Sequence, residues 1–170
     1  TYIDNLKVMT AQNLYDSKTG NIIKLTDKLS KELKIPEPPI DWWASEKWDG
    51  IRALWDGEKM ISRGSGVGKP KVYTFIPEWF KMTLPPGIAL DGEIWIGRGL
   101  FQKTSRLSTI KPGKSYTQEQ INNIWTGTED PPVIFKVFDV PGQTTPFEQR
   151  MRLLQTIVKD RKACWDKLEY

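Results

Sequence analysis

A lysine followed at fixed offsets by an acid, a glycine and an arginine is the stretch of this sequence best suited to chemistry. The residues are Lys47, Asp49, Gly50 and Arg52. At neutral pH a lysine amine with an ordinary pKa of ~10.4 is almost wholly protonated, and only its neutral form attacks an electrophile. Burial, cationic neighbours or a metal would favour that form. The pattern therefore predicts that Lys47 is a nucleophile.

The residues around Lys47 predict how it is held. Apolar and aromatic runs on both sides place it at the end of a strand. In a regular strand Asp49 would share its face, where the carboxylate could hold a divalent cation or orient the amine. Gly50 permits a tight turn or a close backbone approach, and the guanidinium of Arg52 suits phosphate. The alternative is a surface Lys and Asp beside a hairpin.

Other charged and aromatic residues lie in expected strands. Asp91 and Glu93 interrupt an otherwise apolar run at the two-residue spacing of one strand face, and buried carboxylates need a cation or hydrogen-bond donors. Arg63 follows the second strand of an expected hairpin. Phe138 lies in a strand of β-branched and aromatic residues, where Phe135 is expected to be ordinary core.

Four segments resemble the motifs of covalent nucleotidyltransferases, the superfamily of ATP-dependent DNA ligases, RNA ligases and mRNA capping enzymes. In order they are KWDGIR (47–52), SRG (62–64), LDGE (90–93) with GRGLFQ (97–102), and VFDV (137–140). The GRGLFQ block is similar to one found in small ATP-dependent DNA ligases of bacterial and viral type. The resemblance covers roughly residues 40 to 158.

The resemblance implies a fold class and a domain organisation. The fold would be an α+β nucleotidyltransferase (adenylation) domain, with antiparallel sheets flanked by helices and incomplete at its C-terminus. Residues 1–170 would be a partial domain, because the family's later Glu-Gly strand, Lys-x-Lys pair and OB-fold domain are not in this sequence. We therefore expect a fragment, or one part of a split protein whose remainder is supplied elsewhere.

The resemblance also implies an activity, in which Lys47 attacks the α-phosphorus of ATP with Mg²⁺ present and forms lysyl-AMP. AMP would then pass to the 5′-phosphate of nicked duplex DNA, and the 3′-hydroxyl would displace it. The implied catalytic residues are Lys47, Asp49 and Arg52, and the implied metal ligands are Asp49 and Glu93. The implied nucleotide-binding residues are Ser45, Glu46, Lys47, Arg52, Arg63, Glu93 and Phe138, and the implied nucleic-acid contacts are Arg63, Arg98, Lys103 and Arg106.

Two alternatives remain open. One is another enzyme of the superfamily, an RNA ligase or a GTP-using mRNA capping guanylyltransferase. The other is a non-catalytic remnant that binds DNA or a partner through basic loops. The formal net charge is +4, and no acidic residue occurs between Glu93 and Glu119, so this stretch suits phosphate contacts.

The composition excludes several kinds of site. The 170 residues contain one cysteine and no histidine, which excludes an internal disulfide, the usual zinc sites and nucleophile pairs that need histidine. No apolar run approaches the ~20 residues of a membrane span. The first residue is Thr rather than Met, so a removed leader stays open; a reducing compartment is favoured.

Local patterns predict most secondary structure. Strands are expected at 6–9, 22–25 and 88–96, over 133–140, and on both sides of Asp56-Gly57. Helices are expected after Thr26, over 77–81, after the capping box at Thr117 and after Thr145, where Phe147, Met151, Leu154 and Val158 fall on one face. The tail from Lys159 is polar and charged.

Overall fold

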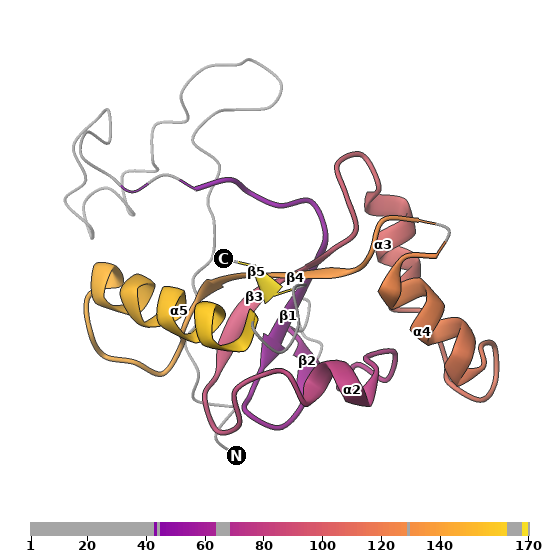
Figure 1. Cartoon of the computed structure of the whole chain (residues 1–170), viewed down its shortest axis with the longest axis horizontal. Helices are drawn as coiled ribbons and strands as arrows, with labels where there is room; N and C mark the ends of the chain where they lie inside the picture. The colour runs from indigo at the N-terminus through magenta and orange to yellow at the C-terminus, as the bar shows by residue number, and fades with distance from the viewer. Residues whose placement is uncertain (1–42, 44, 64–68, 129, 163–167, 170) are drawn as a thin grey trace. The chain divides into compact units, whose positions relative to one another are not determined.

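The computed structural model describes residues 43, 45–63, 69–128, 130–162 and 168–169. The chain separates into two compact units, Thr1–Val8 with Trp48–Tyr170, and Met9–Lys47. Every helix and strand described below belongs to the first unit (Figure 1). The strands expected at 6–9 and 22–25 and the helix expected after Thr26 lie outside the described residues.

One sheet organises the described part of the chain. Its strand order is β2-β1-β3-β4-β5, and the first four strands are antiparallel, as expected for an α+β fold. The two-residue β5, which is parallel to β4, was not predicted. The strands are β1 (Ile51–Trp55), β2 (Met60–Ser62), β3 (Leu90–Trp95), β4 (Ile134–Asp139) and β5 (Leu168–Glu169).

The predicted hairpin at Asp56-Gly57 is confirmed. It joins β1 to β2 with Trp55 opposite Met60. The Asp56 carboxylate accepts the N–H of Glu58 at 2.8 Å, and Gly57 has a φ of +98°, which a residue with a side chain rarely adopts. The hairpin places β1 between β2 and β3, with both edges paired.

Four described helices flank the sheet, with α5 on one side and the other three on the opposite side in Figure 1. The predicted capping box of α4 is confirmed: Thr117 Oγ1 accepts the Gln120 N–H at 3.2 Å, and Gln120 Oε1 accepts the Thr117 N–H at 2.8 Å. Helix α3 was not predicted. The helices are α2 (Glu78–Lys81), α3 (Phe101–Leu107), α4 (Gln118–Thr126) and α5 (Phe147–Lys162).

Alternate strand residues build the hydrophobic core. Ala53, Ile94 and Phe135 lie on one face of the sheet and are fully buried, which confirms Phe135 as core. Trp125 of α4 packs into the same cluster and donates its indole N–H to the Phe75 carbonyl at 3.0 Å. Burying a side chain such as Ile94 or Phe135 contributes about 1.5–3 kcal/mol. The opposite face of the same strands carries charged as well as apolar residues.

The last long helix packs much as its periodicity predicted. Leu154 and Val158 are buried, and Met151 is half-buried against the core. Among the described residues, no helix combines the length and apolar composition needed to cross a bilayer.

Candidate functional site

A row of three charged side chains crosses the polar face of the sheet. Arg52 on β1 lies opposite Glu93 on β3, and Glu93 lies opposite Lys136 on β4. Cross-strand partners point to the same face, so these residues are neighbours. The strands thus bring the KWDGIR, LDGE and VFDV segments together.

Two glycines let these segments approach closely. The Gly50 N–H donates to Glu93 Oε1 at 3.2 Å, and a Cβ at Gly50 would lie 2.2 Å from the Ile94 carbonyl oxygen. A Cβ at Gly92 would lie 2.4 Å from the Lys136 carbonyl oxygen, beside an irregularity in the β3–β4 pairing. Any side chain at either position would push backbone apart. Of the two roles expected for Gly50, a tight turn or a close backbone approach, the structure shows the close approach.

Asp91 and Glu93 both receive the partners that buried carboxylates need. Asp91 is 1% exposed and accepts two bonds from Arg52, at 3.0 Å from Nε and 2.6 Å from Nη2. Burial raises the pKa of Asp91 above its usual value, the pairing with Arg52 opposes that rise, and the nearby Asp139 adds to it. Arg63 also opposes the rise, so its charge acts on the same site.

An aromatic ring and a phenol complete the surroundings of Arg52. The Arg52 guanidinium carbon lies 5.0 Å from the centroid of the half-buried Phe138 ring. The Tyr73 hydroxyl donates to the Arg52 carbonyl at 3.0 Å. Burial, with a contribution from the Glu93 charge, raises the pKa of Tyr73 to about 12. Arg52 is therefore fixed at both its guanidinium and its backbone.

A cluster of tryptophans and cations adjoins this row. The Trp48 and Trp95 rings meet edge to face with centroids 5.1 Å apart. Lys136 Nζ lies 4.2 Å from the Trp48 centroid and 5.1 Å from the Trp95 centroid, and the Arg98 guanidinium carbon lies 5.8 Å from that of Trp48. Sequence reasoning missed this cluster, although Lys136 is the one charged residue between Val133 and Phe138.

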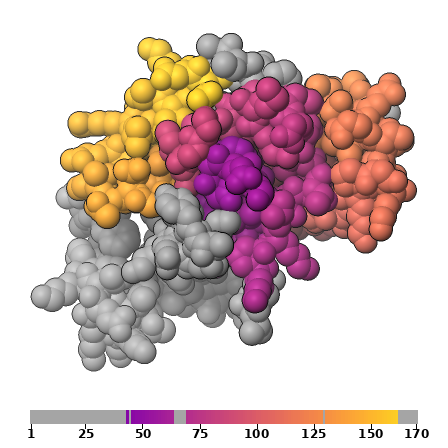
Figure 2. Space-filling view, turned by 90° about the horizontal axis from the view of Figure 1, so that it is seen from below, coloured from indigo at the N-terminus to yellow at the C-terminus, as the bar shows by residue number. Residues whose placement is uncertain are grey.

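The segment that carries the predicted nucleophile is exposed and irregular. Ser45, Glu46, Lys47 and Asp49 are all exposed, and regular pairing begins only at Ile51. The prediction that Lys47 and Asp49 share the face of a regular strand was therefore wrong. Figure 2 shows violet atoms, the colour of the chain around β1, at the surface between magenta and rose segments.

The predicted metal ligands are an exposed and a half-buried carboxylate, Asp49 and Glu93. Within the described ranges, no three or more side chains of His, Cys, Asp or Glu gather as a metal-binding group. Mg²⁺ commonly takes only one or two protein carboxylates and completes its shell with waters and substrate phosphates. The two carboxylates of Asp49 and Glu93 therefore match the number and type of protein ligands that Mg²⁺ commonly takes.

The predicted nucleic-acid residues fall into two groups. Arg63, which is exposed just after β2, and Arg98 adjoin the charged row. Lys103 and the exposed Arg106 are on α3, where Lys103 forms an ion pair with Asp130.

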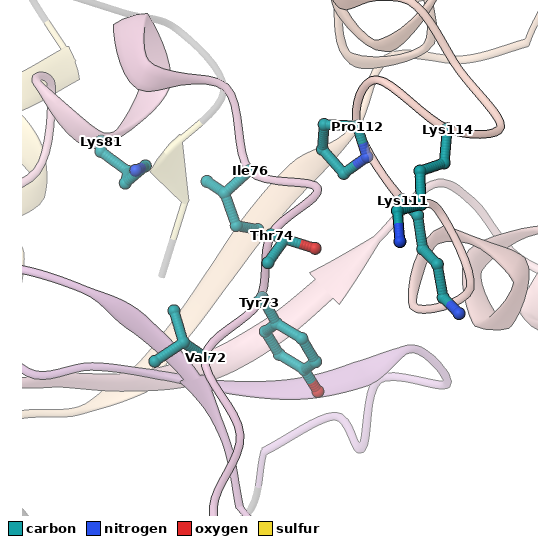
Figure 3. Close-up of a pocket in the computed structure, with 8 residues that line it drawn as sticks. All are labelled: Val72, Tyr73, Thr74, Ile76, Lys81, Lys111, Pro112 and Lys114. Atoms are coloured by element: carbon teal, nitrogen blue, oxygen red, sulfur yellow. The ribbon is translucent and has the colours of Figure 1, made fainter.

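A wide hollow of about 640 Å³ opens beside Tyr73. Figure 3 shows Lys111 and Lys114 close together on one side of it and Lys81 on the other. Its walls are largely apolar, and Tyr73 belongs both to this hollow and to the surroundings of Arg52. The lining residues are Val72, Tyr73, Thr74, Ile76, Lys81, Lys111, Pro112 and Lys114.

Two of the matches found by comparison with known proteins each cover more than two thirds of this chain. The chain is 27% identical over 118 residues to a DNA ligase of Haemophilus influenzae, a match that covers 69% of this chain and 36% of the ligase. It also matches a solved structure from a structure-function analysis of Lig E DNA ligases, concerned with DNA binding by a minimal scaffold. That match has 29% identity and a TM-score of 0.50, and covers 71% of this chain and 40% of the other. No family model matches the sequence. The chain thus spans less than half the length of either relative.

Proposed function

Because this chain is a distant homologue of DNA ligases, as its motifs predicted, we propose that it is part of the nucleotidyltransferase domain of an ATP-dependent DNA ligase. Residues 1–170 then form a partial domain, and the remaining strands and an OB-fold domain come from elsewhere in the parent protein or from another chain. Its partner is nicked duplex DNA, and its nucleotide is ATP.

The bonding between motifs is the observation that carries this proposal. The Gly50 N–H donates to Glu93, and Arg52 pairs with Asp91, so KWDGIR and LDGE are joined although 39 to 43 residues separate the bonded pairs. Phe138 of the VFDV motif lies under the same arginine. Residues implied in one nucleotide site are thus held on three neighbouring strands. Chance matches to short motifs would give no reason for these residues to lie side by side.

In the proposed reaction, Lys47 Nζ attacks the α-phosphorus of ATP. A nitrogen–phosphorus bond forms, the bond to the β-phosphate oxygen breaks, and pyrophosphate leaves, while the amine gives up a proton. The 5′-phosphate oxygen of the nick then attacks the same phosphorus and releases Lys47. Finally the 3′-hydroxyl attacks the 5′-phosphorus, seals the strand and releases AMP.

The described side chains take distinct roles in this proposal. Arg52 places positive charge beside bound phosphate or the sugar at the nick, and its two bonds to Asp91 fix where that charge lies. Glu93 would lie beside the ribose and the metal. Phe138 would stack on the adenine, and Ser45 and Glu46 would meet the adenine edge.

Mg²⁺ would be held by Asp49 and Glu93 together with phosphate oxygens. When bound, it would offset negative charge on the reacting phosphates. Arg63 and Arg98 would contact the DNA backbone beside the charged row, with Lys103 and Arg106 extending the basic surface along α3.

The first test is the intact mass of the protein after incubation with ATP and Mg²⁺. We expect one AMP on the parent, none on Lys47→Ala, and an unchanged adduct on the matched variant Lys59→Ala, which alters an exposed lysine in the β1–β2 turn. GTP in place of ATP should give no adduct. A GTP adduct would instead favour a capping enzyme.

If the 170-residue chain takes up no AMP, the measurement is repeated with the rest of the parent protein present. Restored AMP uptake supports a partial domain. If there is still no AMP uptake, and the Lys47→Ala variant still binds nicked duplex DNA, the enzymatic proposal is overturned in favour of a DNA-binding remnant. Nicked DNA and nicked RNA substrates, compared directly, separate DNA ligase from RNA ligase activity.

A further inference from the structure

We propose that Trp48, Trp95 and Lys136 form a clamp that positions the backbone carrying Lys47 for nucleotide transfer. The inference rests on the proposed function. It assigns Lys136 and the two tryptophans as positioning residues that act through the main chain. None of them is a residue to which the motifs gave a role.

The clamp joins three separate segments. Trp48 comes before β1, Trp95 ends β3, and Lys136 lies within β4. Lys136 Nζ is 4.2 Å from one ring centroid and 5.1 Å from the other, and the rings themselves meet edge to face at 5.1 Å. Both cation distances are within the range of attraction between an ammonium and an aromatic face.

The burial of Lys136 needs such an explanation. Its exposed fraction is 8%, and the neighbouring strand residues Phe135 and Val137 are core. Removing an ammonium from water is unfavourable unless other groups replace the lost hydration. Two indole rings and the cross-strand neighbour Glu93 surround this position. An apolar residue would suit the strand equally well, but it would not hold Trp48 in this way.

Trp48 connects the clamp to the nucleophile. Lys47 is bonded directly to Trp48, and two residues later the Gly50 N–H is held by Glu93. The segment 48–50 is therefore fixed at both ends, by a ring and by an amide. Because displacement of a reacting group by about 1 Å can slow a reaction about 100-fold, loosening Trp48 should slow attack by Lys47 without altering the nucleotide pocket.

The experiment compares Lys136→Met, which removes the charge but keeps a long side chain, with Lys136→Arg, which keeps the charge. Lys59→Met is the matched control, because Lys59 is an exposed lysine in the β1–β2 turn, at the opposite end of β1 from Trp48. All are made in the form of the protein that takes up AMP. We expect Lys136→Met to slow single-turnover AMP transfer about 10- to 100-fold, with the half-saturating ATP concentration nearly unchanged. Lys136→Arg should recover most of the rate, and Lys59→Met should match the parent.

Two readouts do not depend on activity. Two indoles this close couple electronically and give paired bands of opposite sign in the circular dichroism spectrum. Lys136→Met should weaken these bands, and so should Trp48→Phe and Trp95→Phe. Trp79→Phe should leave them unchanged. Exchange of the Gly50 amide hydrogen should also become faster in Lys136→Met. If the parent never takes up AMP, the proposed function fails, while these readouts still test the clamp.

Three outcomes would overturn the inference. One is a Lys136→Met protein with the parent rate. Another is a loss of ATP affinity as large as the loss of rate. The last is unchanged dichroism and amide exchange. If Lys136→Met does not fold, Trp48→Leu replaces it, since Trp48 is half-exposed; the same loss of rate at unchanged ATP affinity is then required, and a parent-like rate rejects the clamp.

Discussion

Two arginine–aspartate pairs whose aspartates lie on neighbouring strands resemble each other closely, yet they join different parts of the molecule. Arg52 donates to Asp91 at 3.0 and 2.6 Å. Arg150 donates to Asp139 at 2.8 Å from Nε and 3.4 Å from Nη2. The two aspartates are cross-strand partners, both are buried, and both arginines are about one-fifth exposed.

The difference between the pairs lies in what each arginine contacts next. Arg150 comes from α5, and its Nη1 donates to the Thr145 carbonyl at 2.8 Å, so this pair fastens a helix and its entry loop to the sheet. Arg52 stays within the sheet, lies over Phe138 and is held by Tyr73. The same pair of side chains thus serves architecture in one place and borders the candidate nucleotide site in the other.

The comparison is tested most strongly by Arg52→Met. Removing one partner of a buried pair leaves an uncompensated charge on Asp91, and we expect a loss of about 3–5 kcal/mol in the free energy of unfolding at neutral pH. AMP uptake should also be lost under conditions in which the variant is folded. Urea unfolding and intact mass measure the two effects.

The loss of stability should depend on pH. Burial already raises the folded-state pKa of Asp91 above its unfolded value, so the contribution of Asp91 to stability is largest in acid and declines as pH rises through the raised pKa. Without Arg52 that pKa rises further. The variant should therefore be closer to the parent at about pH 5 than at about pH 8. Equal losses at both would contradict a charged Asp91 as the cause.

Arg150→Met should separate stability from activity. Asp139 keeps a bond from the Val140 N–H at 2.9 Å, so we expect a smaller loss, about 1.5–3 kcal/mol for bonds to a charged group. The folded variant should still take up AMP at close to the parent rate. A rate that falls as far as in Arg52→Met would mean that the two pairs do not differ in function.

Sequence reasoning succeeded where the determining signal is local. The turn residues Asp56 and Gly57 specify their hairpin, and the Thr117 capping box specifies the start of α4, because each forms its bonds within four residues. Helix α3 has no such signal, since its N-cap residue Leu100 makes no side-chain capping bond. The two-residue β5 depends entirely on pairing with distant β4.

The candidate site was predictable in residue type more than in arrangement. Spacing indicated that Asp91 and Glu93 share a face and need partners, but strand register decides that Arg52 serves Asp91 and that the Gly50 amide serves Glu93. The role of Lys136 could not be predicted, because the aromatic rings that it contacts come from other segments. Motif resemblance identifies residues one segment at a time, whereas contacts between segments require the fold.

Gly50→Ala sharpens the comparison by disturbing the Arg52 side of the sheet while leaving both ion pairs chemically intact. The new methyl group would meet the Ile94 carbonyl oxygen at 2.2 Å, so the backbone must move, and we expect a loss of about 1–3 kcal/mol, typical of overpacking. AMP uptake should fall more than stability predicts. Gly97→Ala is the control, because its methyl group would meet only the Leu100 side chain, at 3.1 Å. If both variants behave alike, close packing at Gly50 has no special role.

Tyr73→Phe should have the smallest effect, because it removes one hydrogen bond to the Arg52 carbonyl and leaves the Arg52–Asp91 pair in place. The expected loss is about 0.5–1.5 kcal/mol. The folded pKa of about 12 exceeds the usual 10.0, so the stability that neutral Tyr73 contributes is present below the unfolded pKa and is lost as pH rises between these values. Ultraviolet titration should show one late-titrating tyrosine in the parent that is missing in the variant. If the variant still shows the late titration, that titration belongs to another tyrosine. The inference that the Tyr73 hydroxyl holds the backbone of Arg52 would then be contradicted.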